Sequence, residues 1–332
     1  MAVVRRIAPF AIYAVLFAGL VTQSGPARFA VVNLAVQLAV FGVGACLPAH
    51  RTGFMSYVDV AWPWGLVALG VQVLVFGDTG SPAAMATAVI YLLMGLRMGV
   101  WSLRFMVLTR LPVELPRYRY QRRRWERDGF RGERLSLQVE ILVQCGANAT
   151  VLAIPALLAA ERSGPFDALS VTAAALWALA WVAESAADRQ KARFTRRSRR
   201  SRREGVHRTC DAGLWRYSRH PNYFAQWMQW NCLILLSLPV LTARWGEEPL
   251  VPDLLMAFGL AWISWTMYHT LVYYTGAVPA EHFSLRKRPD YDLYRRTTNR
   301  FFPGPRRPAP AAAGTPAAVG PRRGGESLPD RR

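Results

Sequence analysis

Eight apolar segments dominate this chain and constrain its fold more than any other feature. A helix needs about 20 mainly apolar residues to cross a bilayer, because its backbone polar groups must all be satisfied within the segment. The segments lie at residues 7–22, 29–48, 57–77, 84–106, 136–160, 168–187, 222–243 and 252–276. The sequence therefore predicts an all-α fold, namely a polytopic integral membrane helical bundle of about eight transmembrane helices.

The Lys and Arg residues between the segments predict the orientation of the bundle. If the N-terminus faces the cytoplasm, the inner regions hold 36 of the 41 basic residues and the outer loops hold three. Because basic loops are retained on the cytoplasmic side, we expect an N-in, C-in topology. The first segment follows Arg5 and Arg6 and would also suit a signal peptide, but as an uncleaved span it completes this topology.

The same topology explains the formal charge of +20. A soluble chain with that charge would indicate a nucleic-acid partner, whereas here the arginines lie in loops between apolar segments. We therefore expect no nucleic acid, and the sequence indicates no protein partner. The four cysteines form no CxxC pair and the five histidines form no HExxH motif, so we expect no metal site. No GxGxxG follows a strand, which excludes a Rossmann domain.

Cationic side chains gather at the start of the seventh apolar segment. Residues 211–230, DAGLWRYSRHPNYFAQWMQW, bring Arg216, Arg219 and His220 directly before Pro221. The planar fork of arginine suits phosphate. Proline is favoured in a first helical turn, where free N–H groups also attract anions. The pattern favours an anionic ligand held at the membrane surface, although a purely positive-inside anchor would place similar residues here.

GLWRYSRHPNYF followed by a Trp-containing apolar run resembles the C-terminal signature of the steroid 5α-reductase family, in particular its uncharacterised bacterial members. Isoprenylcysteine carboxyl methyltransferases carry a related RHPxY core. The resemblance covers about residues 57–303 and is strongest over 184–223 and 281–303. It implies a dinucleotide bound on the cytoplasmic face of a bacterial plasma (inner) membrane, and the many arginines favour NADPH.

A second part of the resemblance lies where the sixth apolar segment ends. The family's ExxxDxQKxxF pattern matches Glu184, Asp188, Gln190, Lys191 and Phe194. In that family this stretch lies beside the dinucleotide. Asp188 and Gln190 would accept hydrogen bonds from ribose or adenine, and Lys191 would neutralise phosphate. Attraction between the basic run and anionic lipid is the alternative, but it does not explain the two acids.

The third part is a polar, aromatic and basic patch near the C-terminal end. Its members are Glu281, Tyr291, Tyr294, Arg295 and Thr297, and they resemble the closing motif of the family. Tyrosines can stack on a nucleotide while arginines meet its phosphates. A cytoplasmic cap packed against the loops is the alternative. Three polar clusters on one predicted membrane face indicate one composite site.

The N-terminal half is expected to supply a substrate chamber. Asp59 lies near the start of the third apolar segment, where an unpaired carboxylate costs about 2.5–3.5 kcal/mol. It is therefore either clamped to Arg97 or Arg104 of the next segment, or it forms the floor of a substrate pocket. Asp59, Trp62 and Gly65 also resemble an acid-Trp-Gly pattern of the bacterial branch.

Tryptophans in the same half would form flat walls for a sterol-like or polyprenyl-like lipid. Trp62, Trp64 and Trp101 have this role in our hypothesis, and interfacial aromatic belts are the alternative. Glu114, Arg117 and Tyr118 resemble the family's ED.RY motif. Leu115 stands in place of the second acid, and we expect the basic run that follows to be a solvated loop.

These observations predict an NADPH-dependent reductase acting on an activated C=C bond of a lipid or steroid-like substrate. The candidate catalytic residues are Asp59, Tyr217, His220 and Tyr223. The candidate cofactor-binding residues are Glu184, Asp188, Gln190, Lys191, Arg216, Arg219, His220, Asn222, Gln226, Glu281, Tyr291, Tyr294 and Arg295. Apart from the substrate, we expect only membrane lipids as partners.

One departure keeps two other functions open. After HPNYF the family usually carries Gly-Glu, whereas this chain has Ala225 and Gln226. Gln226 still hydrogen-bonds an amide but has no charge. The alternatives are an S-adenosylmethionine-dependent methyltransferase of the isoprenylcysteine type and a non-catalytic lipid-binding membrane protein.

The predicted organisation has three parts. Residues 1–50 supply N-terminal transmembrane helices, 51–304 form the steroid-reductase-like membrane domain, and 305–332 form a basic Pro/Ala/Gly-rich tail. The tail has no apolar periodicity, so we expect it to be disordered.

Overall fold

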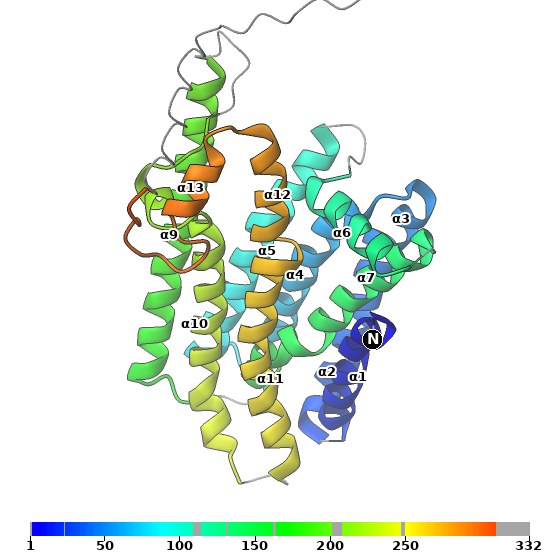
Figure 1. Ribbon diagram of the computed structural model, residues 1–332. Helices are drawn as coiled ribbons and strands as arrows, with labels where there is room; N and C mark the ends of the chain where they lie inside the picture. The colour runs from blue at the N-terminus through cyan, green and yellow to red at the C-terminus, as the bar shows by residue number, and fades with distance from the viewer. Residues whose placement is uncertain are drawn as a thin grey trace, which may run out of the picture.

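The computed structural model describes residues 2–22, 24–108, 114–130, 132–161, 164–200, 208–246 and 250–309. Within these ranges the chain forms α-helices joined by short 3₁₀ and π turns, and no strand (Figure 1). The helices are α1 Ala2–Val21, α2 Ser24–Phe41, α3 Leu47–Thr52, α4 Val58–Phe76, α5 Pro82–Leu108, α6 Pro116–Arg127, α7 Glu133–Ala149, α8 Ile154–Glu161, α9 Ala168–Arg200, α10 Pro221–Arg244, α11 Leu250–His269, α12 Ala277–Lys287 and α13 Tyr291–Thr297.

Seven helical segments of the described residues are long and apolar enough to span a membrane. They are Gly25–Thr52, Met55–Phe76, Pro82–Leu108, Glu133–Glu161, Ala168–Ser198, Pro221–Arg244 and Leu250–Lys287. The first predicted span corresponds to a shorter apolar helix, Arg6–Val21. The prediction of an all-α polytopic bundle is confirmed, and the protein is an integral membrane protein.

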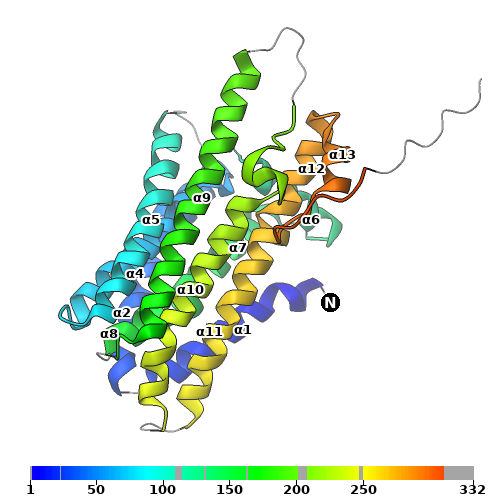
Figure 2. The same cartoon turned by 90° about the vertical axis from the view of Figure 1, so that its left-hand side faces the viewer.

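Two helix pairs in the bundle are packed especially closely. Helix α4 packs along α5, and α9 packs along α10, which also contacts α11 (Figure 2). The α4–α5 contact is close because of Gly95, where an added Cβ would lie 2.7 Å from the Pro63 carbonyl oxygen. Small residues at such crossings let backbones approach within a membrane. Helix α2 covers the other side of α4 and also contacts α7.

The fifth predicted span is broken into α7 and α8. At Thr150 the backbone leaves the helical region (φ −125°, ψ −84°), which frees carbonyl oxygens inside the bundle. The fully buried Asn33 of α2 compensates, because its Nδ2 donates to the carbonyls of Asn148 (3.3 Å) and Ala149 (3.0 Å). Gln37 in turn donates to Asn33 Oδ1 at 3.1 Å. A break at membrane depth is tolerated where protein groups satisfy the freed backbone in this way.

The polar elements gather at one end of the bundle. The C-terminal part of α9, the N-terminus of α10, and α6, α12 and α13 all lie toward the top of Figure 1, the end predicted to face the cytoplasm. The predicted solvated loop after Glu114 is in fact helix α6, which buries Tyr118 and Trp125. At the opposite end Arg244 pairs with Glu161 (2.6 Å) and Asp253 (2.9 Å).

The start of the predicted tail is held against the bundle. Arg306 pairs with Asp211 at 2.9 Å, and the Arg307 N–H donates to the Thr297 carbonyl at 2.8 Å. The remainder of the tail, residues 310–332, lies outside the described residues. The proposed boundary near residue 50 stays a prediction.

Candidate functional site

The first part of the site is a tight turn, Gly213–Arg216, shortly before α10. Gly213 adopts a positive φ of 62°, and a Cβ at this position would lie 2.6 Å from Gln190 Oε1. Gln190 Oε1 accepts a hydrogen bond from the Leu214 N–H at 2.9 Å, and Trp215 Nε1 donates to the Ala187 carbonyl at 2.9 Å. Gln190, predicted as a cofactor ligand, therefore uses its acceptor to anchor the turn on α9.

The segment 299–304 fixes the other side of this turn. The Arg219 N–H donates to the Asn299 carbonyl (2.9 Å), Ser218 Oγ donates to the Phe301 carbonyl (2.9 Å), and the Gly304 N–H donates to the Tyr217 carbonyl (3.0 Å). Helix α10 then begins at Pro221, as the sequence predicts. These contacts place Arg219 and the following histidine at the helix start.

A buried histidine–glutamate cluster forms at that position. His220 Nε2 lies 3.2 Å from Glu281 Oε1, and Arg219 Nε lies 3.0 Å from the same oxygen. Arg300 Nε approaches the second oxygen, Glu281 Oε2, at 3.4 Å. The first three side chains are at most 6% exposed. Burial lowers the pKa of His220 to about 4, although the hydrogen bond to Glu281 opposes this shift, so the imidazole is neutral at pH 7.

Two buried tyrosines of α13, Tyr291 and Tyr294, lie next to this cluster. Tyr294 is buried, and its hydroxyl donates to the Trp215 carbonyl at 2.6 Å. Tyr291 contacts the Tyr294 ring edge-on at 5.7 Å. Burial raises the pKa of both tyrosines well above the ordinary value, so both stay protonated. Arg295, by contrast, is exposed and pairs with Asp292 at 3.0 Å, although its carbonyl accepts from Arg219 at 2.6 Å.

Three helices contribute to a second group, the carboxylate–arginine cluster. Arg97 of α5 binds Glu184 Oε2 (2.5 Å) and Asp188 Oδ2 (2.8 Å) of α9. Asn222 of α10 donates to Asp188 Oδ1 at 3.0 Å, and Gln229 donates to Glu184 Oε2 at 2.6 Å. Glu184 and Asp188 are four residues apart on α9, so a single guanidinium bridges them.

The predicted clamp between Asp59 and Arg97 or Arg104 is wrong. Asp59 pairs with Arg117 Nη2 at 2.8 Å and accepts from the Tyr118 hydroxyl. The reason is geometric, because Arg97 faces α9 while Asp59, in the first turn of α4, faces α6. Burial alone would lower the pKa of Arg117, but Asp59 and neighbouring tyrosines raise it above the ordinary value. The Arg117 side chain is 38% exposed, so the pair it forms with Asp59 is only partly shielded from solvent.

Tyr223 lies between the histidine–glutamate cluster, the carboxylate–arginine cluster and the Asp59–Arg117 pair. Its ring stacks on His220 with centroids 5.3 Å apart and planes at 3°, and it interacts electrostatically with Asp59, Arg117 and Asp188. Among the described residues no hydrogen-bond partner of its hydroxyl is found. The buried Asn222 Oδ1 next to it is also without a hydrogen bond in this part of the chain. The centre of the site therefore offers a phenol and an amide oxygen.

The other predicted residues lie around this centre. The Lys191 ammonium sits 4.1 Å from the Trp215 ring centroid, and Gln226 Nε2 contacts Met98 Sδ at 3.4 Å. Arg216 and Tyr217 are exposed on the turn, and Tyr217 is 50% exposed. No side-chain contact joins Tyr217 to His220 or Tyr223 within the described ranges. The arrangement therefore favours His220 and Tyr223, and not Tyr217, as candidate catalytic residues.

A family model described as "Protein of unknown function (DUF1295)" matches residues 47–298, which is most of the chain. The chain belongs to this family. The DUF1295 region contains α4 to α13 and thus Asp59, Arg97, Tyr223 and Glu281. Neither a curated protein nor a solved structure matches the chain.

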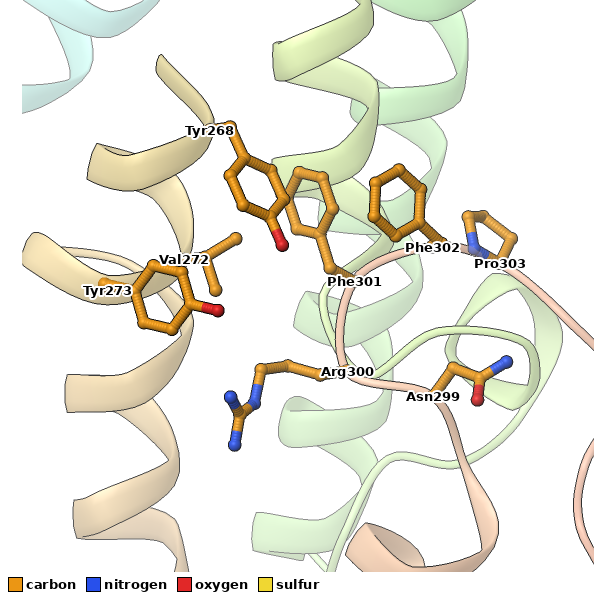
Figure 3. A pocket seen from close by; sticks show the side chains of 8 residues that line it. All are labelled: Tyr268, Val272, Tyr273, Asn299, Arg300, Phe301, Phe302 and Pro303. Atoms are coloured by element: carbon orange, nitrogen blue, oxygen red, sulfur yellow. The ribbon is translucent and has the colours of Figure 1, made fainter. Parts of the chain in front are cut away.

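An aromatic pocket of about 370 Å³ lies at the C-terminal edge of the DUF1295 region, lined by residues on both sides of that edge (Figure 3). Tyr268 and Tyr273 line one wall, while Phe301 and Phe302 line the other, and Arg300 lies below them. Since Arg300 also approaches Glu281, this pocket adjoins the histidine–glutamate cluster.

The sequence placed Arg117 and Tyr118 in the ED.RY-like segment but did not pair them with Asp59, and it paired Arg97 with Asp59 instead of Glu184 and Asp188. It assigned no role to Arg300. A signal for the partners of Arg97 was present, since an arginine in an apolar span favours an acidic partner, and Glu184 and Asp188 are acids at the polar end of another span. The roles of Arg117 and Arg300 depend on how α6 and the segment 299–304 cross the end of the bundle.

Proposed function

We propose that this DUF1295 protein is a membrane-embedded NADPH-dependent reductase acting on an activated C=C bond of a lipid or steroid-like substrate. The resemblance of residues 184–223 and 281–303 to the steroid 5α-reductase family motivates the reaction class. The observation that carries the proposal is the convergence of three polar groups on Tyr223, whose hydroxyl is not otherwise engaged in the described chain.

The residues around Tyr223 suit a dinucleotide. The unpartnered Asn222 Oδ1 would accept from a carboxamide N–H. Both Asp188 oxygens already have one partner, but the side chain is 47% exposed and would accept further hydrogen bonds from hydroxyl groups. Arg216 and the exposed arginines of α9 would meet phosphates. Gln190 and Tyr294 contribute by holding the turn and not by direct contact, since both bind the backbone. When bound, NADPH supplies a hydride.

The chain's own residues would then manage charge and protons. In the proposed reaction the Tyr223 hydroxyl donates to the substrate oxygen on which negative charge develops. Arg117 stabilises that charge electrostatically from its position beside Asp59. The neutral His220, held by Glu281, fixes the Tyr223 ring by stacking.

The cofactor assignment is tested by binding to the purified protein in detergent. We expect NADPH to bind in preference to NADH and S-adenosylmethionine, and Asn222→Ala to weaken NADPH about tenfold, as for loss of a strong hydrogen bond. Asn231→Ala is the matched control, because Asn231 lies on the same helix and donates to the Trp227 carbonyl instead. Binding of S-adenosylmethionine alone would move the assignment to methyl transfer. If the folded protein binds none of these three ligands, the alternative of a non-catalytic lipid-binding membrane protein is favoured.

The same preparation tests the role of Tyr223. With a steroid enone or a polyprenyl enone as probe, Tyr223→Phe should lower kcat by about 10²–10⁴-fold, the usual contribution of a positioned proton donor. NADPH affinity should not change. Wild-type turnover by the Phe variant would remove Tyr223 from the mechanism.

A further inference from the structure

Helices α5 and α9 border a groove of about 480 Å³ on the face of the bundle turned toward the viewer in Figure 2. Its walls carry Leu93, Leu96, Val100 and Trp101 of α5 and Trp181 of α9. Val100 is 53% exposed and Trp101 is 66% exposed. Both helices are long and apolar enough to span the membrane, so these side chains face lipid rather than water.

Two arginines interrupt the apolar walls of this groove. Arg97 and Arg104 both line it and are seven residues apart on α5, so they lie about 10 Å apart along the helix axis. Arg97 is neutralised by Glu184 and Asp188, and its guanidinium lies 5.7 Å from the Trp181 ring centroid. Arg104 is exposed, and no acid among the described residues forms an ion pair with it.

The position of Arg104 favours an anionic partner from the membrane. A cation in the hydrocarbon is costly, and a long side chain lowers that cost by reaching the interface, where anionic lipid headgroups lie. Arg104 lies near the end of α5, on the side where α9 leaves the bilayer. The end of the groove is therefore positively charged.

We propose that this groove binds one membrane lipid with an anionic phosphate headgroup. The phosphate meets Arg104, whose planar fork matches it, and an acyl chain lies along Leu93, Leu96 and Val100 toward the middle of the bilayer. A volume of about 480 Å³ falls within the usual ~300–1,000 Å³ of small-molecule sites. The groove includes Arg97, so the lipid contacts one member of the carboxylate–arginine cluster.

The lipid site is tested by titrating the detergent-solubilised full chain with fluorescent phosphatidylglycerol. We expect Arg104→Gln to weaken binding about tenfold, the effect of one charged hydrogen-bonded contact. Leu96→Trp should weaken it to a similar degree, because the larger ring fills the groove while every charge is kept. Arg51→Gln is the control, since Arg51 is an exposed arginine of α3 on the far side of the bundle (Figure 1), and it should change binding less than about twofold.

Equal losses in the Arg104 and Arg51 variants would mean only diffuse attraction between basic residues and anionic lipid, and would overturn the site. Displacement of the lipid by millimolar inorganic phosphate would instead identify a bare phosphate site and overturn the lipid. NADPH binding is measured on the same samples, and Arg104→Gln should leave it unchanged. The lipid proposal therefore stands or falls separately from the proposed reductase function.

Discussion

At the scale of single residues, His220 shows how burial decides a charge state. The imidazole lies beside a carboxylate, which would normally favour protonation, but it also faces Arg219 and Lys191 and has almost no solvent. Desolvation is the largest influence, and it keeps the ring neutral. A neutral ring stacks on Tyr223 without placing a further cation next to Arg117.

The low pKa of His220 predicts acid sensitivity. The unfolded chain binds a proton near pH 6.5 and the folded chain only near pH 4, so the stability contributed by neutral His220 is complete above pH 6.5. This contribution to the free energy of unfolding amounts to about 3 kcal/mol, and it is lost progressively as the pH drops toward 4. Thermal unfolding in detergent at pH 7.5, 6 and 5 measures the slope. His220→Gln should flatten the slope, and an unchanged slope in that variant would contradict the prediction.

Residue identities in the site were more predictable than their contacts. Arg219, His220 and Tyr223 follow one another in RHPNY, and local chain geometry keeps them adjacent. Gln190 was predicted to bind a nucleotide but binds the backbone of the turn, since a polar motif does not show which of its groups serve the chain itself. The wrong partner for Asp59 has a similar cause, because helix rotation determines which charges face each other.

At the scale of elements, the break between α7 and α8 depends on one amide side chain. Asn33 supplies both hydrogens that reach the freed carbonyls, and its oxygen accepts from Gln37 (3.1 Å) and Gln72 (3.2 Å). All three amide side chains are buried. A buried network of this kind is stable only while every member keeps its partners.

Removing that amide should therefore destabilise the bundle strongly. Asn33→Ala leaves two buried carbonyls without a donor and should lower the free energy of unfolding by about 3 kcal/mol. Val31→Ala, at a position 53% exposed on the same helix, should have a much smaller effect. Thermal unfolding of both variants in detergent makes the comparison, and equal midpoints would argue against the role of Asn33.

Element boundaries were predictable wherever a long apolar run ended in charge. The predictions failed at α6, whose basic composition resembles a solvated loop although Tyr118, Gln121 and Trp125 form a buried face. They also failed at Thr150, because the compensating Asn33 is more than a hundred residues away in sequence. Both failures involve contacts between distant segments, which local patterns do not contain.

At the scale of the whole molecule, the predicted orientation remains to be measured. The fold itself was predictable, since the thickness of a bilayer fixes the length of each apolar helix. The bundle places the basic elements α6, α12 and α13 at one end and the turn between α4 and α5 at the other (Figure 1). Which helices adjoin was not predictable, because apolar surfaces in lipid carry little information about their neighbours.

Cysteine labelling distinguishes the two orientations. Thr79→Cys, in the exposed turn between α4 and α5, should react with a membrane-impermeant maleimide in intact cells. Arg296→Cys, at an exposed position in α13, should react only after the membrane is opened. The protein with its four native cysteines gives the background. The reverse pattern would show that the basic end faces outward and would overturn the cytoplasmic placement of the site.

The hydrogen bonds between residues 217–219 and 299–304 impose an order on assembly during synthesis. Helix α10 and every residue of the carboxylate–arginine cluster leave the ribosome before residues 299–304 are made, and proteins generally fold from the N-terminal side first. The seven spanning helices can therefore be inserted while the turn ahead of α10 is still unsecured. A chain stopped before residue 299 would be a membrane-inserted bundle with an unfinished site, so correct insertion alone would not report a functional protein.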